Sequence, residues 1–238
     1  MKKLYLDCTN GVSGDMLAAA LYELLENKEE YLKRLKAALP KGIAVCFENS
    51  ERCGVKGSTL SVSENRERKH EHITLNGITE IINSMELSSS TKRDVLCVYA
   101  LIAKAESRAH KVSADEVHFH EVGSERAITC VTAACLAFNM LGADGVCCSK
   151  VNTGFGKVSC AHGVLDVPAP AVRELLREIP HFSGEICGEL TTPTGAALIK
   201  YYAESFEEKT AADNCSEGYG IGKRDFGIST ALKAAIIK

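Results

Sequence analysis

Apolar positions along the chain follow the spacing of strands in some stretches and that of helices in others, beginning at the N-terminus. Residues 4–6 form a short apolar run that leads into a polar, glycine-bearing stretch at 7–15. The apolar residues that follow recur with the period of a helix that buries one face, namely Met16, Leu17, Ala20, Leu21, Leu24 and Leu25. The pattern predicts a strand, a turn and a helix, in that order.

The same criteria predict the other elements of the chain. We expect strands over 43–47, 59–62, 146–151, 157–160 and 231–237, and helices over 28–39, 75–85, 96–110, 124–142, 170–178 and 193–204. One of these helices should begin at Ser124, whose side chain can cap its first turn, and end at Gly142, which can adopt the left-handed conformation. The run Gly218-Tyr219-Gly220-Ile221-Gly222 follows no clear strand and precedes no helix, so it is interpreted as a flexible loop.

These elements predict a mixed α/β (α+β) fold with a strand-turn-helix N-terminus and a single sheet core with packed helices. One domain over residues 1–238 is expected. A subdivision near residue 143 would separate a helix-rich half, 1–142, from a strand-rich half, 143–238.

Composition narrows the classes of function. With 45% hydrophobic residues, the 238-residue chain can bury a sizeable core, and a net charge of -3 gives it no overall positive field to bind nucleic acid or a membrane surface. No apolar run approaches the length of a membrane span, so a cytoplasmic location is expected. The 11 cysteines include no Cys-x-x-Cys pair, which favours reduced and mostly buried thiols.

Four of the seven histidines form two pairs with a single residue between them, His70 with His72 and His118 with His120. In an extended backbone, residues two apart point to the same side, so each pair presents two imidazoles together. Imidazole suits zinc, copper, iron and nickel, and Glu121 can add an oxygen ligand. The spacing predicts a metal clamp, with plainer alternatives: a solvated loop for the first pair, which follows a charged run, and structural histidines for the second.

Three other stretches have the character of ligand-binding loops. The turn over 7–15 holds Gly11, Ser13 and Gly14 at the start of a helix, where free backbone N–H groups and the helix dipole favour an anion such as phosphate. An ordinary strand-to-helix turn capped by Ser13 is the alternative interpretation. Polar loops near strands and cations beside glycines extend the set of candidate phosphate and substrate contacts to His162, Thr192, Thr194, Lys223 and Arg224.

Five motifs follow one another along nearly the whole sequence. The first two motifs are Asp7-Cys8-Thr9-Asn10-Gly11-Val12-Ser13-Gly14-Asp15-Met16 and Val117-His118-Phe119-His120-Glu121-Val122-Gly123. The others are His162-Gly163 followed by Val167-Pro168-Ala169-Pro170-Ala171, then Glu189-Leu190-Thr191-Thr192-Pro193-Thr194-Gly195, and Gly218-Tyr219-Gly220-Ile221-Gly222. With these motifs in this order, the chain resembles the nickel insertion protein family (LarC family).

The resemblance implies a cyclometallase, a lyase-type enzyme of cofactor biosynthesis that places Ni²⁺ into a pyridinium mononucleotide bearing two thiocarboxylates. CTP is consumed and a divalent ion, Mg²⁺ or Mn²⁺, assists. A carboxylate or histidine can take the proton that leaves the ring as the metal–carbon bond forms, and Asp7, Asp15 and Glu121 are the candidates for this base. The resemblance also implies a C-terminal CTP-binding domain that this sequence lacks, which we expect a separate subunit to supply. A homo-oligomer is expected.

The chain departs from the family pattern after Gly123. The pattern continues with a run of the type Ala-Val-Asp-Ser-Ile-Val-Asp, whereas this sequence reads Ser124-Glu125-Arg126-Ala127-Ile128-Thr129-Cys130. Both aspartates are replaced, and Arg126 puts a cation where the pattern has a carboxylate. A non-catalytic carrier of metal or nucleotide, or a degenerate homologue, is therefore an alternative function, and a metal-dependent hydrolase is a further one.

Overall fold

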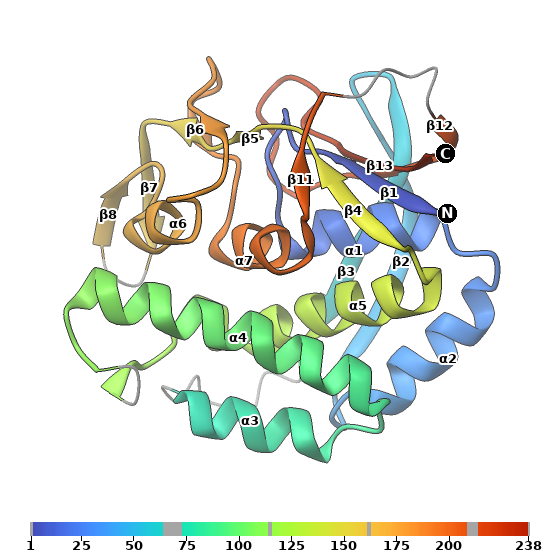
Figure 1. Cartoon of the computed structure of the whole chain (residues 1–238), viewed down its shortest axis with the longest axis horizontal. Coiled ribbons are helices and arrows are strands. Elements are labelled where there is room, and N and C mark those ends of the chain that lie inside the picture. Colours follow the sequence, from blue (N-terminus) through green and yellow to red (C-terminus); the bar gives the residue numbers. More distant parts are fainter. Residues whose placement is uncertain (1, 64–72, 114–115, 161–162, 209–213, 238) are drawn as a thin grey trace.

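A seven-stranded mixed sheet forms the centre of the molecule in the computed structural model, which describes residues 2–63, 73–113, 116–160, 163–208 and 214–237 (Figure 1). Its strands lie in the order β11 (Ser205–Phe206), β4 (Gly145–Cys148), β1 (Lys3–Asp7), β13 (Leu232–Ile237), β12 (Asn214–Gly220), β3 (Val55–Ser63) and β2 (Ala44–Arg52). β4 is parallel to β11 and to β1, and β12 is parallel to β3. The other pairs are antiparallel. Strands from before and after residue 143 thus share one sheet.

The helices gather on one side of this sheet, as Figure 1 shows. α1 and α5 pack together against the sheet with α7 beside them, and α4 crosses them on the outside with α3 against it. The helix bounds are α1 (Gly14–Glu23), α2 (Lys28–Ala38), α3 (Leu75–Ser84), α4 (Ser89–His110), α5 (Glu125–Leu141), α6 (Pro170–Leu175) and α7 (Pro193–Tyr202). In the part of the chain that the structure describes, no helix is long and apolar enough to cross a membrane.

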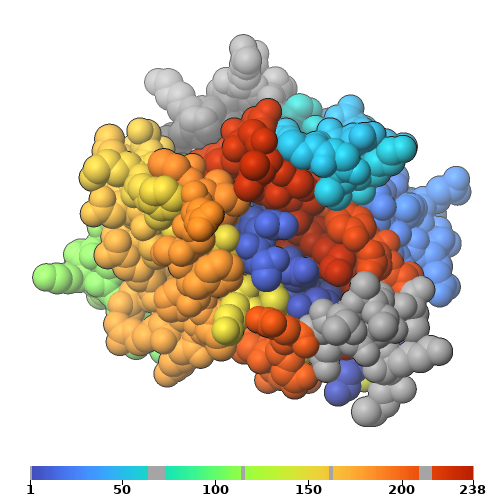
Figure 2. Space-filling view, turned by 90° about the horizontal axis from the view of Figure 1, so that it is seen from above, coloured from blue at the N-terminus to red at the C-terminus, as the bar shows by residue number. Residues whose placement is uncertain are grey.

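Three two-stranded ladders lie beside the main sheet. They pair β5 (Val151–Asn152) with β9 (His181–Phe182), β6 (Gly154–Phe155) with β10 (Gly188–Glu189), and β7 (Lys157–Cys160) with β8 (Gly163–Asp166). Seen from above in Figure 2, the blue N-terminal segment lies between the yellow and orange segment that carries these ladders and the red C-terminal segment. The region around the first turn is therefore bordered by parts of the chain that are distant in sequence.

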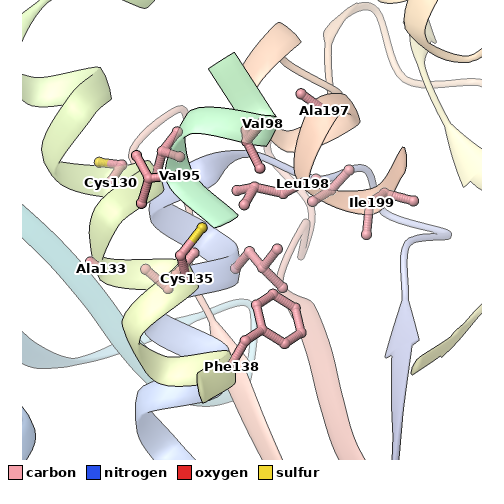
Figure 3. Close-up of a cluster of buried hydrophobic side chains, with 14 of the residues drawn as sticks. Val95, Val98, Cys130, Ala133, Cys135, Phe138, Ala197, Leu198 and Ile199 are labelled. Carbon is pink, nitrogen blue, oxygen red and sulfur yellow. The ribbon is translucent and has the colours of Figure 1, made fainter. Parts of the chain in front are cut away.

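The main hydrophobic core lies among the helices and against one face of the main sheet. In Figure 3, Val95 and Val98 of α4, Phe138 of α5 and Leu198 and Ile199 of α7 meet in one cluster. On β1, Leu4 and Leu6 face this core, whereas Tyr5 points to the opposite side and joins a small second cluster. The alternation explains why an apolar run as short as residues 4–6 can be buried on both faces.

The predicted mixed fold is confirmed, and so are several local signals. Ser124 caps α5 by accepting a hydrogen bond from the N–H of Ala127, and Gly142 ends that helix with a φ of 58°. The helix predicted to reach Glu178 is shorter than expected, because α6 ends at Leu175. The cysteines at 8, 130, 135, 147 and 148 are buried, those at 97 and 160 are partly buried, and those at 46, 53 and 187 are exposed. The expectation of mostly buried thiols therefore holds for only part of the described cysteines.

The prediction of a flexible loop at the glycine run is wrong. Gly218 and Gly220 belong to β12, and the absence of side chains lets α1 lie directly on this strand. A Cβ added at Gly220 would lie 1.8 Å from the carbonyl oxygen of Met16, and one at Gly218 would lie 2.5 Å from that of Ala20. The glycines therefore serve the close approach of a helix to a strand, one of the roles of glycine within a strand.

Candidate functional site

A pocket of about 610 Å³ lies at the N-terminal ends of α1, α5 and α7. The residues predicted from the sequence that line it are Ser13, Gly14, Asp15, His118, His120, Glu121, Thr192, Thr194, Lys223 and Arg224. His70, His72 and His162 lie outside the described residues. Separate motifs of the sequence thus meet around one cavity, while the roles assigned to their residues stay predictions.

Asp7 and Gly11 are not among the lining residues and instead shape the turn before α1. The carboxylate of Asp7 accepts hydrogen bonds from the backbone N–H and the hydroxyl of Thr9, at 3.1 and 2.6 Å. Gly11 has a φ of +85°, and a Cβ there would lie 2.3 Å from the carbonyl oxygen of Leu190. Of the three candidate bases, only Asp15 and Glu121 face the pocket.

The N-termini of α1 and α7 lie side by side at the pocket. The backbone N–H of Thr192 donates to the carbonyl of Val12 at 3.0 Å, and a Cβ at Gly195 would lie 2.2 Å from the same carbonyl oxygen. Ser13 caps α1 and Thr192 caps α7. Two positive helix ends therefore act on one region of the pocket, which favours an anion there.

An ion pair joins α5 to α1 in the pocket wall. A guanidinium nitrogen of Arg126 lies 3.1 Å from Asp15 Oδ2, and Oδ1 of the same carboxylate accepts from the hydroxyl of Ser13 at 2.5 Å and from the N–H of Met16 at 3.1 Å. Both oxygens of Asp15 are thus engaged by neighbouring groups. Arg126 brings a positive charge to this part of the cavity.

The second histidine pair lies on a segment held in place by the residue between its members. Phe119 is buried, forms an antiparallel bridge to Ile73 and donates its N–H to the carbonyl of that residue at 2.9 Å. His118 and His120 line the pocket together with Phe119. In the described ranges, no three His, Cys, Asp or Glu side chains are grouped closely enough to hold a metal ion.

Glu189 is a pocket residue that was not singled out as a site candidate from the sequence. It lies on β10, its side chain is only 10% exposed, and a guanidinium nitrogen of Arg224 lies 3.1 Å from its Oε2. Burial raises the pKa of this carboxyl, while the charge of Arg224 opposes the rise. A single glutamate in a short strand has no spacing signal of its own; its position at the start of the motif 189–195 was the one available hint.

Comparison with known proteins relates this chain to a family. The family described as "Nickel insertion protein" matches residues 4–238. The chain belongs to the nickel insertion protein family. No solved structure matches it.

Named relatives of this nickel insertion family member come from several bacteria. It is 36% identical to the "Pyridinium-3,5-bisthiocarboxylic acid mononucleotide nickel insertion protein" of Staphylococcus epidermidis, over 98% of this chain and 58% of the relative. The protein of the same description from Clostridium kluyveri is 38% identical, over 98% of this chain and 61% of the relative. A "Putative nickel insertion protein" of Dictyoglomus thermophilum is 34% identical, over 99% and 61%. The chain spans about three fifths of the length of these relatives.

Proposed function

We propose that this chain inserts nickel into pyridinium-3,5-bisthiocarboxylic acid mononucleotide, the compound named in the descriptions of its relatives. The reaction would be a CTP-dependent cyclometallation that yields the nickel-pincer cofactor, carried out by this chain alone or as an N-terminal subunit. The observation that carries the proposal is the meeting of His118 and His120 with the N-termini of α1 and α7 at one pocket.

The phosphate of the mononucleotide is assigned to the two adjacent helix ends. Ser13, Thr192 and Thr194 offer hydroxyl groups there, and the backbone N–H groups of the first helical turns supply oriented dipoles. Lys223 and Arg224 add positive charge from the loop after β12. An anion therefore gains from helix ends and side-chain cations in the same cavity.

Nickel is the metal substrate and is assigned to His118 and His120, with Glu121 as an oxygen donor. Imidazole nitrogen is a good ligand for Ni²⁺, and the thiocarboxylate sulfurs of the mononucleotide are softer donors that can take over the ion. In the described residues His118, His120 and Glu121 are not grouped closely enough to hold the ion by themselves, so the sulfurs of the bound substrate would complete the coordination. Incomplete protein ligation suits a site that must release its metal.

A resident Mg²⁺ or Mn²⁺ does not fit the described residues. Such hard cations require several oxygen ligands around one point. Over the described part of the chain no group of three His, Cys, Asp or Glu side chains could hold such an ion, and Asp15 is already paired with Arg126. No step is therefore assigned to this ion. The CTP requirement, the lyase class, a separate C-terminal subunit, a homo-oligomer and a cytoplasmic location are further parts of the proposal.

A second candidate function, a carrier that binds the mononucleotide or nickel without joining them, is favoured by the Arg126–Asp15 pair. The pair places a cation in the pocket wall where the family pattern has a carboxylate, and this cation would repel a second metal ion.

The test supplies the purified chain with Ni²⁺, CTP and the bisthiocarboxylate mononucleotide, with and without the C-terminal portion of a longer relative, and follows the nucleotide by mass spectrometry. We expect a nickel-containing mononucleotide in at least one of the two mixtures. Stoichiometric binding of nickel or mononucleotide with no product in either mixture would support the carrier. Neither binding nor product would contradict both functions.

A further inference from the structure

Among the described residues, four carboxylates line the pocket, and they differ in what surrounds them. Asp15 is bonded to Arg126, Ser13 and the N–H of Met16, and Glu106 lies 3.5 Å from His110. Glu121 belongs to the exposed turn beside His120. Of these four, only Glu189 combines a side chain that is 10% exposed with a place on a strand and an ion pair to the 55% exposed side chain of Arg224.

The loop that carries Arg224 is held firmly over Glu189. Arg52 donates from its guanidinium to the carbonyl oxygens of Gly222 and Arg224, at 2.7 and 2.5 Å. On the other side the ring of Phe226 covers Gly188, where an added Cβ would lie 2.6 Å from a ring carbon. These contacts fix the backbone around the carboxylate and leave the end of the Arg224 side chain exposed.

We infer that Glu189 is the base that accepts the proton from the pyridinium ring during nickel insertion, and that Arg224 is its positioning residue. The inference rests on the proposed function and deepens it, because the sequence offered Asp7, Asp15 and Glu121 for this role. Asp7 lies outside the pocket and Asp15 has both oxygens engaged. Glu189 is largely buried, lines the cavity and can be released by the movement of one arginine.

The proposed step balances without a redox partner. The carbon–hydrogen bond of the ring carbon between the two thiocarboxylates breaks, its electron pair forms the bond to Ni²⁺, and the proton passes to an Oε atom of Glu189. Nickel keeps its oxidation state. A carboxylate withdrawn from water is a stronger base than an exposed one, which suits the removal of a weakly acidic proton. If the substrate phosphate attracts Arg224, the guanidinium moves away from Glu189 as the pyridinium ring binds, and the carboxylate is then able to accept the proton.

The experiment compares the unaltered chain with Glu189→Gln in the complete insertion mixture, measuring binding and turnover separately. Gln keeps the shape of the side chain and cannot take a proton. We expect dissociation constants for nickel and mononucleotide to stay within about threefold while the insertion rate falls by about 10²- to 10⁴-fold. Glu174→Gln is the matched control, since Glu174 is also a half-buried carboxylate paired with arginine but lies away from the pocket.

A second variant covers the case in which Gln disturbs the site. Glu189→Ala leaves a small cavity, and added formate should restore its insertion rate by at least tenfold if a carboxylate is needed there as a base. Insertion by Glu189→Gln at the rate of the unaltered chain would overturn the assignment while leaving the proposed function intact. No insertion by the unaltered chain in either mixture would overturn both.

Discussion

The guanidinium of Arg126 lies 3.1 Å from the carboxylate of Asp15, although 111 residues separate them in the chain. The pair connects the first turn of α5 to the first turn of α1 and forms part of the pocket wall. The resemblance to the nickel insertion family implies a carboxylate at the position of Arg126. The opposite charge in this chain neutralises Asp15 and makes the wall more favourable to an anion.

Removal of this cation should weaken the binding of a pyridine mononucleotide. In Arg126→Ala the carboxylate of Asp15 would repel the phosphate, and we expect the dissociation constant to rise about tenfold, roughly 1.4 kcal/mol. Isothermal titration calorimetry measures this directly. Arg108→Ala, which breaks an ion pair with Glu174 away from the pocket, is the control. Asp15→Asn added to Arg126→Ala should recover most of the loss, and equal affinity of all variants would refute the anion assignment.

Because α1 packs closely on β12, even a glycine-to-alanine substitution in this strand should cause a large loss of stability. Gly220→Ala would place a Cβ 1.8 Å from the carbonyl oxygen of Met16, so the helix must move away from the sheet. We expect a loss of about 3 kcal/mol or more in the free energy of unfolding. Gly227→Ala, at a φ of +73° with open space around it, should lose only about 1 kcal/mol. Urea unfolding distinguishes them, and similar losses would mean that the helix and strand are not in close contact.

The buried thiols predict a loss of stability in alkali. Burial raises the pKa of Cys135 from 9.0 to about 12, so the unfolded chain loses this proton at a lower pH than the folded chain. The stability that the thiol provides is complete below pH 9.0 and decreases as the pH rises toward about 12, by at most about 1.4 kcal/mol for each pH unit. Urea unfolding from pH 7 to 10 should show little of this decrease below pH 9.0 and a clear decrease above it.

Two alanine variants test whether Cys135 causes this dependence of stability on pH. Cys135→Ala should unfold with a smaller dependence on pH, whereas Cys46→Ala, which removes an exposed thiol, should keep the original dependence. An unchanged slope in Cys135→Ala would exclude this thiol as its source. The comparison uses the change with pH, so the constant cost of the cavity left by the first substitution does not affect it.

Local chemistry made much of the fold predictable. Ser124 and Gly142 mark the ends of α5 because a capping hydroxyl and a left-handed glycine act within one turn of the helix. The glycines of β12 led to a wrong prediction of a loop, because the atoms that require glycine there are not local. They belong to α1, about 200 residues earlier in the chain. Local sequence patterns predict structure that depends on neighbouring residues. They do not predict close contacts between segments that are distant in the sequence.

The candidate site, too, was predictable where it depends on local motifs and not where it depends on the packing of distant segments. The motifs around Ser13, His118 and Thr192 each suggested a binding loop, and the structure brings all three to one pocket. The ion pair of Arg126 and the burial of Glu189 had no sequence signal, because both depend on how α5, β10 and the loop after β12 pack. The alternation around Phe119 predicted a shared direction for the two imidazoles beside it; the structure places His118 and His120 at the same pocket, and their pairing around a metal stays a prediction.

Nickel titration in the presence and absence of the mononucleotide tests most directly whether one pocket holds both substrates. The unaltered chain should bind Ni²⁺ more tightly when the mononucleotide is present, because the sulfurs complete its coordination, and by linkage the mononucleotide should bind more tightly with nickel. His118→Ala combined with His120→Ala should lower nickel affinity at least tenfold with the fold retained, whereas His181→Ala, outside the pocket, should not. Nickel titrations that are identical in the double variant and the unaltered chain, or unaffected by the mononucleotide, would contradict the account.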